Sequence, residues 1–125
     1  MPAGDPPPYA EAEIHARLAR ELPHWQTDGR ALLRRYRTGG WRATLMIANA
    51  IGHLAELAWH HPELTLAYDS LTVHLSTHTA HGVTDKDFVL ARKIEDLVCW
   101  QPEREGGPLE GLPPDPQFAY LRPLG

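Results

Sequence analysis

Residues 56–87 constrain the fold more than any other stretch, because they join two helix patterns through two alternating segments. The first helix pattern must end before Pro62, since proline cannot continue a helix and pushes the preceding residue into extended backbone. Residues 64–68 then alternate between apolar and small or polar side chains, and a turn at residues 69–70 leads into a second alternation over residues 71–78. This pattern predicts an antiparallel hairpin between two helices.

The remainder of the chain repeats the same kinds of element. Helix patterns occupy residues 9–22, 41–59 and 84–99, and further strand patterns occupy residues 25–27 and 31–38. Asp28-Gly29 between the latter two predicts a type I′ hairpin turn, in which both central residues take positive φ. Thr84 with Asp87 three positions later resembles a capping box at the start of the last helix.

The resulting order, α-β-β-α-β-β-α, predicts an α+β domain with one four-stranded antiparallel sheet and three helices packed on one face. We expect a disordered, proline-rich leader over residues 1–8, the domain over residues 9–100, and a Pro/Gly-rich tail over residues 101–125. Phe118 and Tyr120 predict that this tail packs along a surface. The open sheet edges favour association between copies of the chain.

Composition narrows the function classes. A chain of 125 residues is one domain, and its net charge of -4 argues against non-specific nucleic-acid binding. A single cysteine, Cys99, excludes an intramolecular disulfide and a thiolate metal cluster. The chain has no signal-peptide pattern and no apolar run of the roughly 20 residues that a membrane helix needs. We therefore expect a cytoplasmic protein that binds neither membranes nor nucleic acid.

Histidines gather at the junctions of the predicted elements. His60 and His61 lie where the first hairpin strand begins, and His78 lies where the second strand is predicted to end. These positions are adjacent in an antiparallel hairpin, so we expect the three rings to meet. Asp87, in the first turn of the last helix, can reach the same place, and Glu56 lies one helical turn before His60.

Neutral imidazoles beside carboxylates suit proton transfer near pH 7, because the histidine pKa of about 6.5 lets one ring donate while another accepts. The pattern therefore favours general acid–base chemistry. Two alternatives stay open. Two histidines and a glutamate can bind zinc, although the HExxH pattern is absent. The histidines can also serve as structural donors to the last carbonyls of a helix.

The spaced pattern Glu56-x3-His60-His61-Pro62-x5-Tyr68-x9-His78-x8-Asp87 resembles the signature of the pterin-4a-carbinolamine dehydratases, also called 4a-hydroxytetrahydrobiopterin dehydratases. The segments Leu22-Pro23-His24-Trp25 and Gly82-Val83-Thr84 are similar too. The resemblance covers about residues 9–100, and it implies the same α-β-β-α-β-β-α fold.

The resemblance also implies a reaction and its residues. Enzymes of the family remove water from a pterin 4a-carbinolamine to give quinonoid dihydropterin, without a metal or other cofactor. It implies that His60, His61 and His78 are catalytic. Residues that orient the rings or bind the substrate are then Glu56, Tyr68, Thr77 and Asp87. Family members form homodimers or homotetramers.

The tail over residues 101–125 lies outside the core of the family, and this leaves a second function open. Dehydratase-like proteins associated with α-carboxysomes look like assembly factors for Rubisco. A resemblance to that branch implies an inactive pterin site, the Rubisco large subunit as partner, and association with the carboxysome. The intact signature favours the dehydratase over this alternative.

Overall fold

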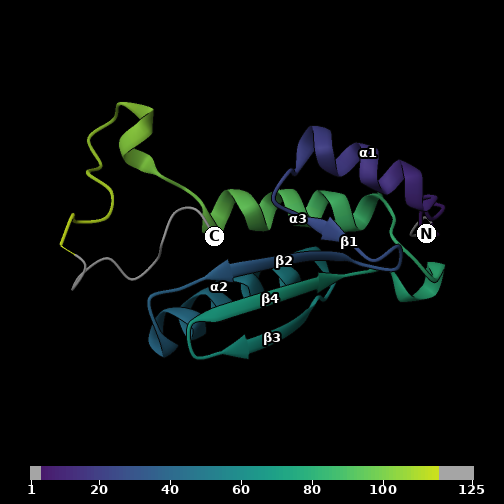
Figure 1. Ribbon diagram of the computed structural model, residues 1–125, viewed down its shortest axis with the longest axis horizontal. Helices are drawn as coiled ribbons and strands as arrows, with labels where there is room; N and C mark the ends of the chain where they lie inside the picture. Colours follow the sequence, from purple (N-terminus) through teal and green to yellow (C-terminus); the bar gives the residue numbers. More distant parts are fainter. Residues whose placement is uncertain (1–3, 116–125) are drawn as a thin grey trace.

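The structure is a computed structural model that describes residues 4–115 (Figure 1). Its elements, in chain order, are α1 (Glu11–Glu21), β1 (Gln26–Thr27), β2 (Leu32–Arg37), α2 (Trp41–Ala58), β3 (Glu63–Ala67), β4 (Ser70–Leu75), the 3-10 turn η1 (His78–Ala80), α3 (Asp85–Val98) and the 3-10 turn η2 (Pro102–Glu105). The predicted α+β class and element order are confirmed.

The four strands form one antiparallel sheet in the order β1-β2-β4-β3. Strand β4 lies in the middle, where Leu75 pairs with Leu32 of β2 and Val73 pairs with Leu64 of β3. Because side chains alternate across a strand, this register puts the apolar residues of β2, β4 and β3 on one face of the sheet. Strands β1 and β3 are the edges.

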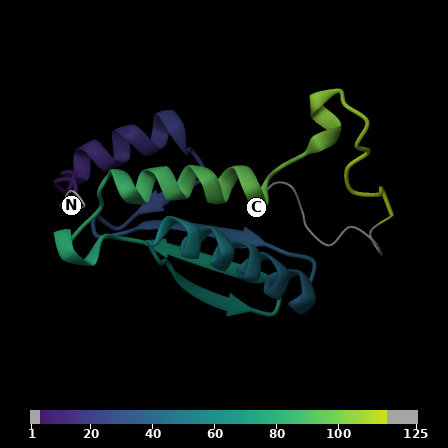
Figure 2. The ribbon, with the colours of Figure 1, turned by 180° about the vertical axis from the view of Figure 1, so that it is seen from behind.

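The three helices cover that apolar face. Helix α3 runs along the sheet between α1 and α2 (Figures 1 and 2), with α1 contacting β1, α3 contacting β2, and α2 contacting β3, β4 and α3. Buried side chains of the helices and the sheet form one core: Ile14, Leu18, Leu22, Trp25, Leu32, Tyr36, Ile47, Ile51, Leu71, Val73, Leu75, Val83, Phe88, Leu90, Ala91, Ile94 and Val98. This core holds the three helices against one face of the sheet.

The turn between β1 and β2 differs from the prediction. Thr27 pairs with Leu32, so residues 28–31 form a four-residue loop. The Asp28 carboxylate accepts hydrogen bonds from the backbone N–H groups of Arg30 and Ala31, at 2.8 and 2.9 Å. Among the described non-glycine residues, only Trp59 and His81 have positive φ, so the type I′ prediction was wrong. The Asp28 side chain closes the loop in place of a tight turn.

Strand β4 is shorter than predicted. It ends at Leu75, and Thr77 forms only an isolated bridge with Gly82. His78 begins η1, so the prediction that it ends the strand was wrong. The backbone N–H of Thr77 donates to the Gly82 carbonyl at 2.8 Å, and this bond turns the chain toward α3 instead of extending the sheet.

The segments outside the core differ in their contacts. Residues 5–9 lie against the chain between Thr79 and Lys86, whereas residues 101–115 extend from the end of α3 away from the sheet (Figures 1 and 2). Leu109 and Leu112 of the tail are 55% and 42% exposed. Phe118 and Tyr120, which carried the prediction of surface packing, lie outside the described residues. Within residues 4–115, no helix combines the length and apolarity needed to cross a bilayer.

Candidate active site

The end of α2 separates the two neighbouring histidines. The helix ends at Ala58, and Trp59 caps it in the left-handed conformation, with φ 50° and ψ 45°. The backbone N–H groups of Trp59 and His60 still donate to carbonyls of the last helical turn. Pro62 then prevents the helix from continuing, and β3 begins at the next residue. This sharp turn directs His60 toward α3, and it leaves His61 beside the outer surface of α2.

His60 meets Asp87 of α3. The Nε2 atom of the ring lies 2.6 Å from Asp87 Oδ1, with side-chain exposures of 14% and 0%. An ionised carboxylate only accepts hydrogen bonds, so Nε2 carries the proton and Nδ1 of the neutral ring is left as an acceptor. The buried carboxylate therefore fixes the tautomer of His60.

The Asp87 carboxylate accepts two further hydrogen bonds in addition to the one from His60. Its Oδ2 accepts from the Thr84 backbone N–H at 2.9 Å, which completes the predicted capping box, and from the Thr77 hydroxyl at 2.8 Å. Because the Thr77 proton is used in this bond, the Thr84 hydroxyl donates to Thr77 across their 2.8 Å contact. A carboxylate without exposure is thus satisfied from both sides.

His61 pairs with Glu56, at 2.8 Å between Nε2 and Oε1. Sequence spacing placed Glu56 beside His60 instead, which holds only if the helix continues. Since α2 ends at Ala58, His61 is the ring that comes back over the last turn. This pair is open to solvent, with exposures of 49% for His61 and 68% for Glu56. Trp59 packs edge-on against the His61 ring, with centroids 5.0 Å apart.

His78 belongs to the same region through its neighbour. It is an exposed residue at the start of η1, directly after Thr77, whose hydroxyl reaches the carboxylate that holds His60. The structure thus brings together His60, Thr77 and Asp87 by direct contact, with His78 adjacent in the chain. Glu56 and His61 form a second pair at the same junction.

Tyr68 lies elsewhere. It follows β3 and is 70% exposed, and a Cβ atom on Gly40 would lie 3.5 Å from its hydroxyl. Gly40 caps the start of α2, whereas His60 follows the end of that helix. A helix of 18 residues is about 27 Å long. Within one copy of the chain, Tyr68 is therefore not brought to the histidines.

A cavity of about 360 Å³ opens beside His60, between the end of α2 and the first half of α3. It is lined by Pro6, Ala58, Trp59, His60, Asp85, Lys86, Val89, Leu90 and Lys93. Most of these side chains are apolar, and the polar ones are charged or titratable. The cavity has the mixed lining typical of small-molecule sites.

Sequence reasoning missed a second buried polar cluster at the other end of α3. Glu95 Oε1 accepts hydrogen bonds from Trp25 Nε1 at 2.9 Å, Arg34 Nε at 2.9 Å and the Tyr36 hydroxyl at 2.7 Å. Cys99 contacts the other oxygen of the same carboxylate at 3.5 Å. The sequence did contain an indication of this cluster. Arg34 lies on the same face of β2 as Leu32 and Tyr36, so its charge is buried in the core and needs a carboxylate partner there.

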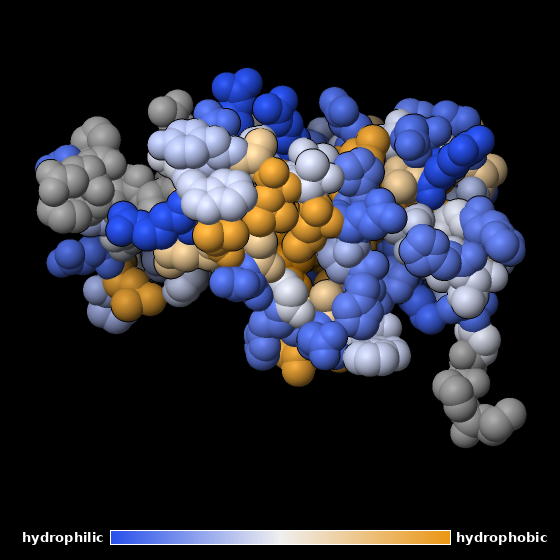
Figure 3. All heavy atoms as spheres, turned by 90° about the horizontal axis from the view of Figure 1, so that it is seen from below, coloured by the Kyte–Doolittle hydropathy of each residue, from blue (hydrophilic) through white to orange (hydrophobic). Residues whose placement is uncertain are grey.

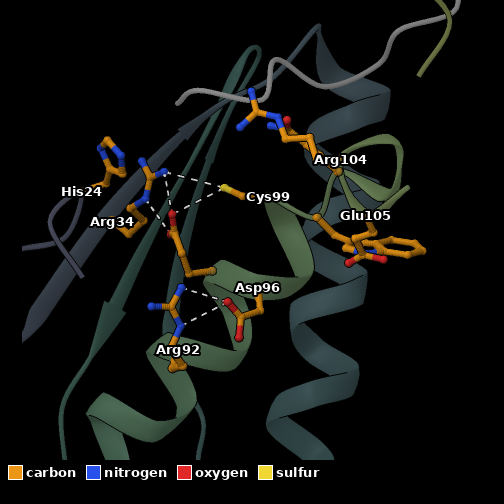
Figure 4. Close-up of a pocket in the computed structure, with 10 residues that line it drawn as sticks. His24, Arg34, Arg92, Asp96, Cys99, Arg104 and Glu105 are labelled. Carbon is orange, nitrogen blue, oxygen red and sulfur yellow. Dashed lines mark hydrogen bonds and ion pairs between the residues drawn. The ribbon is translucent and has the colours of Figure 1, made fainter. Parts of the chain in front are cut away.

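This cluster forms the wall of a cavity of about 520 Å³ between α3 and η2. Figure 4 shows Arg34 and Cys99 pointing toward one another there, with Arg92 paired to Asp96. Burial favours neutral Glu95, but hydrogen bonds from Arg34 and Tyr36 outweigh it and lower the pKa of Glu95 to about 2. Burial raises the pKa of the Cys99 thiol to about 11. The cluster is suited to holding the fold, since its charges are already paired.

Comparison with known proteins identifies the family. The family model described as pterin 4 alpha carbinolamine dehydratase matches residues 7–97, which is most of the chain. The chain belongs to this family. The matched residues include every position of the spaced histidine and carboxylate pattern, and they leave out the tail.

Individual relatives agree. A Thermomicrobium roseum protein named after this dehydratase is 40% identical over 83 residues, which cover 66% of this chain and 89% of that protein. The crystal structure of a transcriptional coactivator/pterin dehydratase from Brucella melitensis matches with a TM-score of 0.65 and 33% identity, covering 72% of this chain and 97% of that one. Both the sequence and the fold of the family are therefore present.

A more distant likeness concerns the alternative function. A pterin dehydratase-like protein described as a RuBisCO assembly factor in the alpha-carboxysome aligns with a TM-score of 0.47 and 18% identity, over 56% of this chain and 81% of that one. At this distance the likeness carries no argument about this chain. Within residues 4–115, no three His, Cys, Asp or Glu side chains are grouped so as to hold a metal ion.

Proposed function

We propose that the protein removes water from the 4a-carbinolamine of a tetrahydropterin. The observation that carries the proposal is the pair of carboxylate–histidine contacts, Asp87–His60 and Glu56–His61, at one junction of a chain of this family. In the reaction, the C4a–O bond breaks and the hydroxyl leaves as water after protonation. The N5–H proton goes to a base, and a C4a=N5 double bond forms. The step needs one acid and one base and no electron acceptor.

The histidines supply both groups in this proposal. A carboxylate that accepts from one ring nitrogen fixes the tautomer and leaves the other nitrogen as the acceptor of a proton. His60 lines the cavity with 14% of its side chain exposed, and the exposed rings of His61 and His78 can contact a pterin bound at the cavity mouth. Thr77 and Asp87 are 3% and 0% exposed, so we assign them to positioning His60 instead of touching the substrate.

The dehydration rate of freshly generated 4a-hydroxytetrahydropterin tests the proposal. We expect the purified protein to accelerate the reaction, and His61→Ala and His78→Ala each to lower the rate by about 10²-fold, the range of a lost acid or base. His53→Ala is the control, since this exposed histidine lies two turns earlier on α2. Equal rates for all three variants and the parent protein would remove the histidines from the mechanism.

A partner-binding tail is the second candidate function, favoured by the exposed Leu109 and Leu112 beyond the family match. The Rubisco large subunit is the partner that the carboxysome branch suggests. Deleting residues 101–125 should then abolish any effect on Rubisco assembly while the dehydration rate persists. An effect on assembly that survives the deletion would exclude the tail as the binding segment.

We propose that the protein also self-associates, whichever of these two functions it performs. Apolar side chains gather in the middle of the face seen in Figure 3, which views the molecule from the side where β3 and α2 lie in Figure 1. Large exposed apolar side chains on α2 include Trp41, Leu45, Met46 and Leu57. Sedimentation of the purified protein should give the mass of a dimer or tetramer.

A further inference from the structure

The chain contains only two lysines, and both line the cavity beside His60. Lys86 and Lys93 lie seven residues apart on α3, which is two helical turns, so they project from the same side of the helix about 10 Å apart. The remaining ten of the 12 basic residues are arginines. The two ammonium groups therefore stand at either end of one wall of this cavity.

The wall between the lysines is apolar. Val89 and Leu90 separate them on α3, and Ala58 and Trp59 face them from the end of α2. A ligand that fills this space needs an apolar or flat body beside His60 and a negative group that reaches a lysine.

The acidic residue on the same wall does not cancel the lysines. Asp85 accepts hydrogen bonds from the Tyr9 hydroxyl and from Arg17, both at 2.6 Å. The Tyr9 hydrogen bond, followed by that of Arg17, lowers the pKa of Asp85. Its charge is thus balanced by Arg17 and does not offset that of Lys93.

The leader already places a carboxylate there. Asp5 contacts Lys86 Nζ at 2.5 Å and also accepts a hydrogen bond from the Thr79 hydroxyl, one residue beyond His78. The leader is anchored close by, because the Tyr9 N–H donates to the Val83 carbonyl at 2.8 Å. The Asp5 side chain is only 21% exposed. An anionic oxygen is therefore accommodated between a lysine and the loop that carries a proposed catalytic histidine.

We propose that this cavity recognises an anionic substituent on the pterin ring, a carboxylate or a phosphate, and that Asp5 occupies the anion position until such a substrate displaces it. The inference rests on the proposed function, since it names the substrate class of the same site. Lys86 and Lys93 are then specificity-determining residues, and Asp5 is a built-in competitor.

The two lysines also provide the readout. In protein labelled with ¹³C at lysine Cε, each lysine gives one NMR signal, which can be followed while three pterins are added: 6-hydroxymethylpterin, its phosphate ester and 6-carboxypterin. We expect the anionic compounds to shift both signals and to bind about fivefold more tightly than the neutral one, because one partly exposed ion pair contributes about 1 kcal/mol. The phosphate and carboxylate arms distinguish the two anions.

Variants sharpen the test. Lys93→Gln and Lys86→Gln should each reduce the preference for the anionic pterins, whereas Arg37→Gln, which makes the same charge change at the far end of β2, should retain it. Asp5→Asn should tighten binding of the anionic pterins several-fold, because the competitor is removed. Equal affinities for neutral and anionic pterins, or weaker anion binding by Asp5→Asn, would overturn the inference. So would lysine signals that respond to inorganic phosphate as strongly as to the phosphate ester.

The dehydration rate distinguishes a failure of this inference from a failure of the proposed function. Acceleration of a neutral 4a-hydroxytetrahydropterin with no preference for anionic pterins would overturn the lysine assignment and leave the dehydratase intact. Preferential binding of anionic pterins without acceleration of any carbinolamine would overturn the dehydratase while supporting the anion site.

Discussion

The Nε2 atom of His60 lies 2.6 Å from Oδ1 of Asp87, although 27 positions separate the two residues in the chain. The contact joins the end of α2 to the start of α3. Asp87 closes the capping box of α3 with its other oxygen, so one carboxylate both starts a helix and orients a ring. The local signal for a helix start and the chemistry of the site are therefore carried by the same side chain.

Asp87→Asn tests this double role. The amide has one acceptor oxygen in place of two, so the bonds from His60, Thr77 and Thr84 cannot all be kept in this buried place. We expect the free energy of unfolding to fall by about 1–3 kcal/mol, the cost of an unsatisfied buried group, and the dehydration rate to fall with it. Urea denaturation and the rate assay measure the two effects. A variant of unchanged stability and rate would contradict the role; Asp96→Asn, an exposed residue on α3, is the control.

Glu56→Gln should separate activity from stability. The Glu56–His61 pair is exposed on both sides, so its loss should change the free energy of unfolding by less than about 0.5 kcal/mol. If His61 transfers a proton, loss of the carboxylate that orients its ring should nevertheless lower the dehydration rate by about tenfold or more. The rate assay, run beside urea melts of the same variant, measures the two effects. An unchanged rate would show that Glu56 does not act on His61.

Glu95→Gln should be the most destabilising of these changes, because it leaves Arg34 buried without its charge partner. We expect a loss of about 3–5 kcal/mol at pH 7, the range for one broken buried ion pair. The folded-state pKa of Glu95 is about 2, below the ordinary value of 4.5, so this stability is present above pH 4.5 and is lost as the pH falls toward 2. The difference between parent and variant should shrink over that range in urea melts. A difference independent of pH would contradict the assignment.

Cys99 should react slowly in the folded protein. Burial, followed by the charge of Glu95, raises the pKa of its thiol to about 11, so little thiolate is present at pH 8. We expect alkylation by iodoacetamide to be at least about tenfold slower than in the urea-unfolded chain, where the pKa returns to about 8.5. Since Cys99 is the only cysteine, mass spectrometry reports the site directly. Equal rates would mean that the Arg34–Glu95 cluster opens readily.

Trp59 offers a test of backbone strain. A side chain in the left-handed conformation costs about 1 kcal/mol, which glycine avoids. Trp59→Ala removes the indole and retains the strain, whereas Trp59→Gly removes both. The glycine variant should therefore be the more stable of the two by up to about 1 kcal/mol in thermal or urea melts. An alanine variant of equal or greater stability would show that the conformation costs nothing here.

The sequence predicted the element order well, since prolines, glycines and alternation mark each boundary. It was less reliable where a side chain closes a turn. Asp28 accepts from two backbone N–H groups and so replaces the expected tight turn by a longer loop. Thr77 bonds to Gly82 and Asp87, which ends β4 before His78. The alternation of apolar and polar residues that predicts a strand carries no information about such hydrogen bonds.

The sequence predicted which residues belong to the candidate site better than it predicted which of them pair with one another. Spacing joined Glu56 to His60, but the left-handed Trp59 rotates the chain so that Glu56 meets His61 and His60 meets Asp87. Tyr68 matched the family pattern, yet the length of α2 keeps it from the histidines within one copy. Helical spacing describes neighbours only while the helix lasts, and the site lies where it ends.

Helix α3 carries two buried carboxylates, Asp87 in its first turn and Glu95 about 12 Å further along. Asp87 orients the ring of His60, and Glu95 holds α3 to the sheet through Arg34 and Tyr36. Side chains that line the proposed pterin pocket without contacting Asp87 can therefore vary while the Glu95 cluster holds α3 to the sheet. Such variation would change which substrates the pocket accepts and leave the fold intact.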